Sequence, residues 1–253
     1  MKRKVFFTTL LASLMTFSTI AFAAEKTVLE YNFNDGKATG WVEYSQDAGR
    51  SMLFTDGTYT APADTSIKTV VGENISDFTI EVDVKVLNGI ANSGVIFRVT
   101  NPKAENGDFF NGYTVGINDI GGGEDGTVYI GRFDQSWNEI GRSEVIPGLL
   151  KDKTVHLKVI VKGSDITVYA DNTKEPVVTA QDDTYTSGAV GVRSHFAAVS
   201  FDNFLVKTET AGESGASIDS SNPKTGDAGA MGVAVLAGLS GLSSLVLLIK
   251  KSK

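Results

Sequence analysis

The chain of 253 residues contains no cysteine and only two histidines. The lack of cysteine excludes thiolate catalysis, zinc sites built on thiolates and disulfide bonds. His156 shares one side of an alternating segment with Lys158, which favours a solvated strand residue, and no Gly-x-Ser-x-Gly motif accompanies His195. The sequence therefore gives no support for a serine-based catalytic triad. Without disulfide bonds, a folded domain must be stabilised by its own hydrophobic core.

Positive charge is scarce between the two ends of the chain. Residues 24–225 keep 17 of the 23 Lys and Arg but 29 of the 30 Asp and Glu, so this part has a formal net charge of −12. An acidic surface repels phosphate backbones, and nucleic acid is therefore not expected as a partner. Acidic clusters also suit calcium, which makes a structural calcium ion a candidate cofactor.

Both ends of the chain have the features of an exported protein. Residues 1–23 join a basic start, an apolar segment and a final Ala-Phe-Ala, which predicts a secretory signal peptide. Residues 209–221 are small and polar and are expected to form a flexible linker. Residues 228–249 carry no charge and are long enough for a transmembrane helix, with the lysines of residues 250–253 on the cytoplasmic side.

A pentapeptide stands before the apolar segment: Asn222-Pro223-Lys224-Thr225-Gly226. A pentapeptide, an apolar helix and a basic tip in this order resemble the sorting signal of Gram-positive surface proteins, which usually begins with Leu instead of Asn. The resemblance implies that a sortase transpeptidase cleaves between Thr225 and Gly226 and joins Thr225 to peptidoglycan. We therefore expect a membrane-spanning precursor and a product on the cell wall; a simple single-pass anchor is the alternative.

Residues 25–208 alternate between apolar and polar side chains and show almost no helical periodicity. In the segment FTIEVDVKV, residues 78–86, every second residue is apolar, which predicts a strand with one face on a core. Further strands are expected at 27–33, 51–62, 93–100, 112–117, 126–133, 155–163, 165–171, 188–196 and 201–207, separated by Asn-Gly and Asp-Gly turns. The fold class is all-β, with two antiparallel sheets in a jelly-roll sandwich.

Paired carboxylates are the remaining candidates for chemistry. Glu81 and Asp83 alternate in one strand and resemble part of the acid-x-acid pattern of sandwich-fold glucanases, but the third acid of that pattern is missing. Glycoside hydrolysis needs two carboxyl groups at a defined separation, which one incomplete strand does not supply. A solvated face or part of a binding surface is the better interpretation.

A calcium site could form where the first and last strands of the domain run side by side. Asn34 and Asp35 follow the first strand, and Asp202 and Asn203 belong to the last. Carboxylate and amide oxygens are hard ligands that suit calcium. However, Asn-Asp-Gly is also an ordinary turn sequence, and both interpretations stay open.

Several segments in order resemble a known group of sandwich domains. They are FTIEVDVKV, SGVIFR, GYTVGI, VYIGRFDQSWNEI, VHLKVIVKGSDITVYAD, DDTYTSGAVGVR and FDNFLVK, which span about residues 75–208. Together they resemble the concanavalin-like modules of carbohydrate-binding family 66 and the wider laminin-G-like group that includes the keto-disaccharide hydrolase family. The resemblance implies sugar binding at a shallow site with aromatic and charged side chains.

Aromatic rings stack on the C–H faces of sugars, and Arg or Asp gives directional hydrogen bonds to neighbouring hydroxyl groups. The candidate residues in the quoted segments are Arg98, Tyr113, Arg132, Asp134, Trp137 and Arg193. For the two aromatic residues, core packing is the alternative role. Arg98 follows Val95, Ile96 and Phe97 in a strand that is expected to be buried, and a buried arginine must have a partner or a function.

The leading hypothesis is a non-catalytic carbohydrate-binding protein on a cell wall, whose ligand could be a fructan. A protein-binding adhesin is the first alternative, which would need a loop patch without an aromatic platform. A glycan hydrolase is the second, which would need two carboxylates in one groove. The ligand itself is set by loops and is not readable from the fold.

Overall fold

The computed structural model describes residues 25–88, 92–105, 109–121, 123–151, 154–171 and 173–209. These residues form two antiparallel β-sheets, and none of them belongs to a helix that could span a bilayer. The predicted signal peptide, sorting signal and transmembrane segment lie outside the described residues, as does the predicted linker after Glu209. The antiparallel sandwich predicted from residues 25–208 is confirmed.

The first sheet has eight strands and follows the order β13-β12-β11-β6-β15-β4-β3, with β1 also paired to β15. Its strands are β1 (Glu25–Tyr31), β3 (Leu53–Thr55), β4 (Thr58–Ala61), β6 (Phe78–Asn88), β11 (Val155–Lys162), β12 (Asp165–Ala170), β13 (Val178–Gln181) and β15 (Ala198–Glu209). The pairing of β1 with β15 confirms that the first and last strands of the domain are neighbours.

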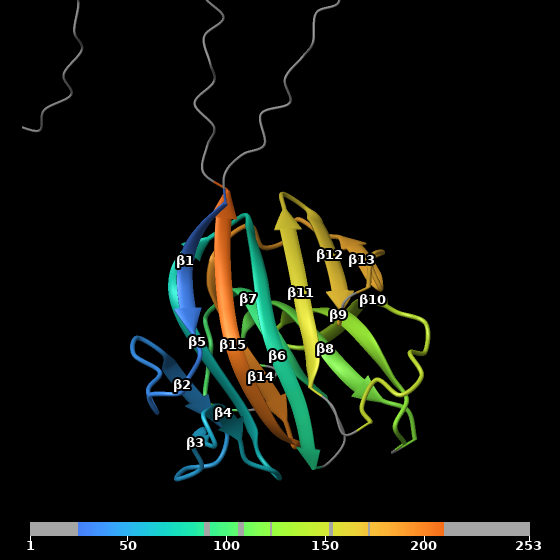
Figure 1. The fold of residues 1–253 in the computed structure, drawn as a ribbon. Coiled ribbons are helices and arrows are strands. Elements are labelled where there is room, and N and C mark those ends of the chain that lie inside the picture. The colour runs from blue at the N-terminus through green and yellow to red at the C-terminus, as the bar shows by residue number, and fades with distance from the viewer. Residues whose placement is uncertain are drawn as a thin grey trace, which may run out of the picture. The chain divides into compact units, whose positions relative to one another are not determined.

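The second sheet has seven strands in the order β10-β9-β8-β7-β14-β5-β2 and stacks behind the first in Figure 1. Its strands are β2 (Val42–Ser45), β5 (Ser66–Ile75), β7 (Asn92–Thr100), β8 (Asn111–Asp119), β9 (Gly126–Asp134), β10 (Trp137–Arg142) and β14 (Gly188–His195). The four strands β7, β8, β9 and β10, which follow one another in the sequence, are also consecutive neighbours in this sheet.

The core lies between the sheets and is built from alternate residues of each strand. Phe78, Ile80, Val82 and Val84 of β6 are at most 3% exposed, as the alternation of this segment predicts, while Val86 at the strand's end is half-buried. Strand β5 escaped prediction because both of its faces are covered over Ser66–Val71, so its sequence does not alternate.

A second, smaller cluster covers part of the outer face of the seven-stranded sheet. Val95 and Phe97 belong to the central core, whereas Ile96 between them packs with Val70 and Phe133 in the second cluster. Since successive side chains of a strand point to opposite faces, this cluster lies on the side of the sheet that turns away from the first sheet. The same outer face carries the candidate functional site.

Candidate functional site

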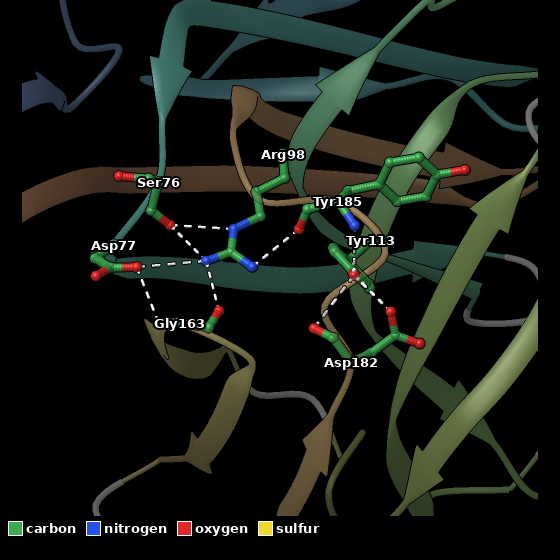
Figure 2. A network of polar contacts seen from close by, with 7 residues as sticks. All are labelled: Ser76, Asp77, Arg98, Tyr113, Gly163, Asp182 and Tyr185. Carbon is green, nitrogen blue, oxygen red and sulfur yellow. Dashed lines mark hydrogen bonds and ion pairs between the residues drawn. The ribbon is translucent and has the colours of Figure 1, made fainter.

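Arg98 joins three loops at one end of the sandwich (Figure 2). Its guanidinium donates to the backbone oxygens of Ser76 at 2.9 and 3.1 Å, Tyr185 at 3.0 Å and Gly163 at 2.8 Å, and lies 3.4 Å from a carboxylate oxygen of Asp77. The side chain is 1% exposed, and burial lowers its pKa. Of the two roles expected for a buried arginine, this geometry supports the structural one, and no ligand can reach Arg98 in this conformation.

A β-bulge explains why Arg98 points toward these loops. The pairing of β7 with β8 shifts between Phe97 and Thr100, and the pairing of β7 with β14 shifts at the same place. Arg98 itself has a φ of 50°, a left-handed conformation that is rare for a side chain of this size. The bulge interrupts the alternation of the strand and turns the arginine to the end of the sandwich.

Tyr113, the second predicted binding residue, is fully buried on β8 and helps to hold the loop between β13 and β14. Its hydroxyl donates to the Asp182 carboxylate at 2.7 Å and accepts from the backbone N–H of Tyr185 at 3.0 Å (Figure 2). Its ring stacks on Phe97 at 5.4 Å between ring centres. Burial, with a contribution from Asp182, raises the pKa of Tyr113 to about 12. Core packing, the alternative role for this tyrosine, is therefore what its surroundings favour.

Arg132 and Asp134, both on β9, also contact the loop between β13 and β14. Arg132 Nη1 lies 2.7 Å from Asp182 Oδ2 and 3.1 Å from the Thr184 hydroxyl, and Asp134 accepts from the Tyr185 hydroxyl at 3.1 Å. Burial alone would raise the pKa of Asp182, but hydrogen bonds from Thr184, Tyr113 and Arg132 lower it to about 2. Four of the six predicted residues thus form one network around the loop of residues 182–187, which we call the loop network.

The other two predicted residues, Trp137 and Arg193, meet at a hollow on the outer face of the seven-stranded sheet. It has a volume of about 290 Å³ and is lined by Asn92, Asn118, Tyr129, Trp137, Arg142 and Arg193. We call it the Trp137 hollow. Trp137 leaves 41% of its surface exposed there, while Arg193 is 3% exposed. The structure therefore brings together an aromatic face, two carboxamides and two guanidinium groups.

The register of the sheet accounts for this hollow. One row of directly paired residues crosses five strands, from Arg193 on β14 to Gly94, Gly116, Tyr129 and finally Arg142 on β10. The two central glycines have no side chain, so long side chains at both ends of the row surround a depressed middle. A glycine within a strand commonly marks such a close approach.

Hydrogen bonds hold the middle of the hollow in place. The Tyr129 hydroxyl donates to the Asn92 side-chain oxygen at 2.6 Å, and Arg193 Nη1 lies 3.4 Å from the same oxygen. The Arg193 guanidinium also lies over the ring of Phe133, 5.1 Å from its centre. Both hydrogen-bond contacts use the side-chain oxygen of Asn92, whose carboxamide also carries a nitrogen that can donate.

Arg142 is fixed on the opposite wall. Its guanidinium binds both carboxylate oxygens of Glu139 and donates to the Thr127 hydroxyl at 2.8 Å, while it lies 5.5 Å from the centre of the Tyr129 ring. The hydrogen bonds to Glu139 raise the pKa of Arg142. A bulge in β10 between Glu139 and Gly141 brings the arginine and its carboxylate to the same face.

Sequence reasoning missed four residues of the hollow: Asn92, Asn118, Tyr129 and Arg142. The signal that could have found the first three of them is the set of glycines inside otherwise apolar strands, Gly94, Gly116 and Gly131. These glycines mark one face of three neighbouring strands. One residue two positions from each glycine, Asn92, Asn118 or Tyr129, shares that face and lines the hollow, whereas Arg142 on β10 is not marked by this signal.

Glu81 and Asp83, for which a solvated face or a binding surface is the preferred interpretation, lie on the outer face of the other sheet, around His156. The imidazole Nδ1 is 2.7 Å from Asp83 and Nε2 is 3.5 Å from Glu81, and the second oxygen of each carboxylate is bound by Asn203 or Lys207. His156 is 39% exposed, as its solvated strand position predicts. A shallow hollow of about 400 Å³ lies beside it.

The predicted calcium ligands do not form a ready site among the described residues. Asp202 accepts from the backbone N–H of Asn203 at 2.7 Å, and Asp35 accepts from that of Lys37 at 3.1 Å. Within this part of the chain no three His, Asp or Glu side chains gather as metal ligands would. The turn interpretation of Asn34 and Asp35 agrees with these contacts, and calcium stays a prediction.

The matches to known proteins fall on the β-sandwich part of the chain. Residues 30–207 match the family model of the 3-keto-alpha-glucoside-1,2-lyase-like domain. No curated protein sequence matches the chain. Among solved structures, the carbohydrate-binding module CBM66 from Bacillus subtilis is 21% identical with a TM-score of 0.54, and the match covers 67% of this chain and 96% of that one.

Two further structures support the fold. A galectin-like protein of unknown function from Bacillus subtilis has a TM-score of 0.55 at 9% identity, covering 75% of this chain and 100% of its own. The exoplasmic/lumenal domain of VIP36, bound to Ca²⁺ and Man3GlcNAc, has a TM-score of 0.52 at 11% identity, covering 71% of this chain and 88% of its own. The chain therefore has the jelly-roll sandwich of carbohydrate-binding modules and lectins.

Proposed function

Because the chain belongs to the 3-keto-alpha-glucoside-1,2-lyase-like domain family, we propose that it binds a saccharide in the Trp137 hollow, without catalysis. The observation that carries this proposal is the exposed face of Trp137 beside the carboxamides of Asn92 and Asn118 in one hollow. An indole ring stacks on sugar C–H groups, and amides both donate to and accept from hydroxyl groups. The proposal is supported by two proteins that share the fold: CBM66 is a carbohydrate-binding module, and the VIP36 domain is bound to Man3GlcNAc.

The charges around the hollow favour a ligand that is held by hydrogen bonds. Arg142 is already bound by Glu139, and Arg193 contacts Asn92 and the Phe133 ring. Fixed guanidinium groups still donate to hydroxyl oxygens, and they need little reorganisation when a ligand arrives. A fructan, or another glycan rich in neighbouring hydroxyl groups, fits this arrangement.

The test is a glycan-array screen of the purified protein, followed by calorimetry on each hit. Trp137→Ala is expected to lower the affinity at least tenfold, about 1.4 kcal/mol. Phe54→Ala is the matched control, because Phe54 is equally exposed at 42% but belongs to β3 at an edge of the other sheet. An array without hits, from a folded protein, overturns the proposal and favours a protein-binding adhesin.

A glycan-cleaving activity is the second candidate, favoured by the lyase after which the family is named and by the contacts of His156 with Glu81 and Asp83. An imidazole that is held in place by Glu81 and Asp83 is a side chain of the type that serves as a general base. Incubation with 3-keto-glucosides and chromatography of the products would test this. Product release that is lost in His156→Gln supports an enzyme, and an unchanged substrate argues against it.

We also propose that the protein is anchored to the cell wall, on the basis of its terminal sequences. The pentapeptide of residues 222–226, the apolar segment and the final lysines have the order of a sortase signal. Thr225→Ala is expected to prevent the acyl transfer and to leave the protein in the membrane fraction. Wall material that still contains Thr225→Ala at the wild-type level would contradict the proposal.

A further inference from the structure

The two aromatic rings of the Trp137 hollow each lie over a glycine of the neighbouring strand. A Cβ atom on Gly131 of β9 would lie 1.9 Å from Cζ3 and 2.2 Å from Cη2 of the Trp137 ring. A Cβ atom on Gly116 of β8 would lie 2.3 Å from the Tyr129 hydroxyl. Both rings therefore occupy the space that a side chain of the next strand would otherwise fill.

The Trp137 ring has little freedom to move away from Gly131. The Tyr129 ring meets it edge to face, with 5.3 Å between ring centres and an angle of 86°, and the tilted Phe133 ring lies at 5.2 Å. Gly131 forms the floor below the ring, between these two neighbours on the same strand. The indole thus has a neighbour on three sides, while Trp137 as a residue stays 41% exposed.

We infer that Gly131 is a positioning residue of the binding site, which holds the Trp137 ring against the sheet as a preformed platform. The inference rests on the proposed saccharide binding and goes further, because it assigns the platform's geometry to a residue that need not touch the ligand. Ordinary contacts begin at 3.4 Å, so a methyl group at Gly131 must displace the ring by more than about 1 Å. A displaced ring no longer faces the hollow as a ready surface, and the cost of ordering it falls on binding.

The experiment is a double-mutant cycle in the full-length protein with Gly131→Ala, Trp137→Ala and both together. Gly123→Ala is the matched control, because its Cβ atom would meet nothing closer than the Ile120 oxygen at 3.5 Å and its φ is not left-handed. Three quantities are measured: the thermal midpoint, the affinity for a saccharide found on the array, and the indole N–H resonance of Trp137 without ligand.

The expected result is a lower thermal midpoint, a shifted indole resonance and an affinity about tenfold lower for Gly131→Ala. In the Trp137→Ala background, the same substitution is expected to change neither the midpoint nor the affinity further, since the ring is gone. If Gly131→Ala alone does not fold, recovery of folding in the double variant supports the same conclusion. Gly123→Ala is expected to match the wild type.

Two results overturn the inference. One is an unmoved indole resonance with unchanged affinity in Gly131→Ala. The other is an equal loss in the wild-type and Trp137→Ala backgrounds, which would show that Gly131 acts without the ring. If the wild type binds no saccharide, the proposed function fails, while the resonance and the coupling in thermal midpoint still decide whether Gly131 positions Trp137.

Discussion

The Asp182 carboxylate makes a specific prediction about how stability depends on pH. It accepts hydrogen bonds from Tyr113 and Arg132, and its pKa is lowered from 3.8 to about 2. At about 1.4 kcal/mol for each unit of pKa, the ionised group contributes about 2 kcal/mol to the free energy of unfolding. This contribution is present above about pH 4 and is lost as the pH falls to about 2.

The measurement is urea denaturation of the wild type and Asp182→Asn at several pH values between 6 and 2. We expect the variant to be less stable than the wild type by about 2 kcal/mol at pH 6, and this difference to vanish near pH 2, where the wild-type carboxylate takes up its proton. Asp183→Asn is the control, since Asp183 is the exposed neighbour on the same loop. A difference that stays constant over this pH range would refute the assigned role of Asp182.

Two further predictions concern the same end of the sandwich. Arg98→Met keeps the aliphatic stem but leaves the backbone oxygens of Ser76 and Gly163 without their donor, so it is expected to lower the free energy of unfolding by about 3–5 kcal/mol in urea denaturation. Tyr113→Phe removes a group whose pKa is raised to about 12, and with it a stabilising contribution that is present below pH 10 and lost as the pH rises through 12. Alkaline unfolding of this variant, followed by circular dichroism, should therefore depend less steeply on pH between 10 and 12.

Alternation and turn residues were sufficient to predict the fold class and most strands. The segment of residues 78–86 has one apolar face, and it became β6 at the centre of its sheet. Four strands were missed: β2, β5, β10 and β13, of which β2 and β13 have only four residues each. Strand β5 is covered on both faces and does not alternate, whereas β10 is a short edge strand with exposed residues.

The candidate site was only partly predictable, because composition identifies side chains that can bind a sugar but does not say which way they point. Trp137 and Arg193 line the hollow, whereas Arg98 and Tyr113 are buried in the loop network. For Arg98 the reason is a β-bulge, which reverses the expected direction and leaves no clear mark in a single sequence. For Tyr113, alternation with Val115 in the same strand would have predicted an inward side chain.

Strand β9 contributes side chains both to the loop network and to the Trp137 hollow. Val128 and Ile130 face the core, and Arg132 continues that face to the loop network, while Tyr129 and Gly131 face the Trp137 hollow. The period of two therefore divides the segment GTVYIGRFD between a structural role on one side and a binding role on the other. Because both roles share one backbone, the contacts of Arg132 within the loop network also help to fix the strand whose glycine supports the tryptophan platform.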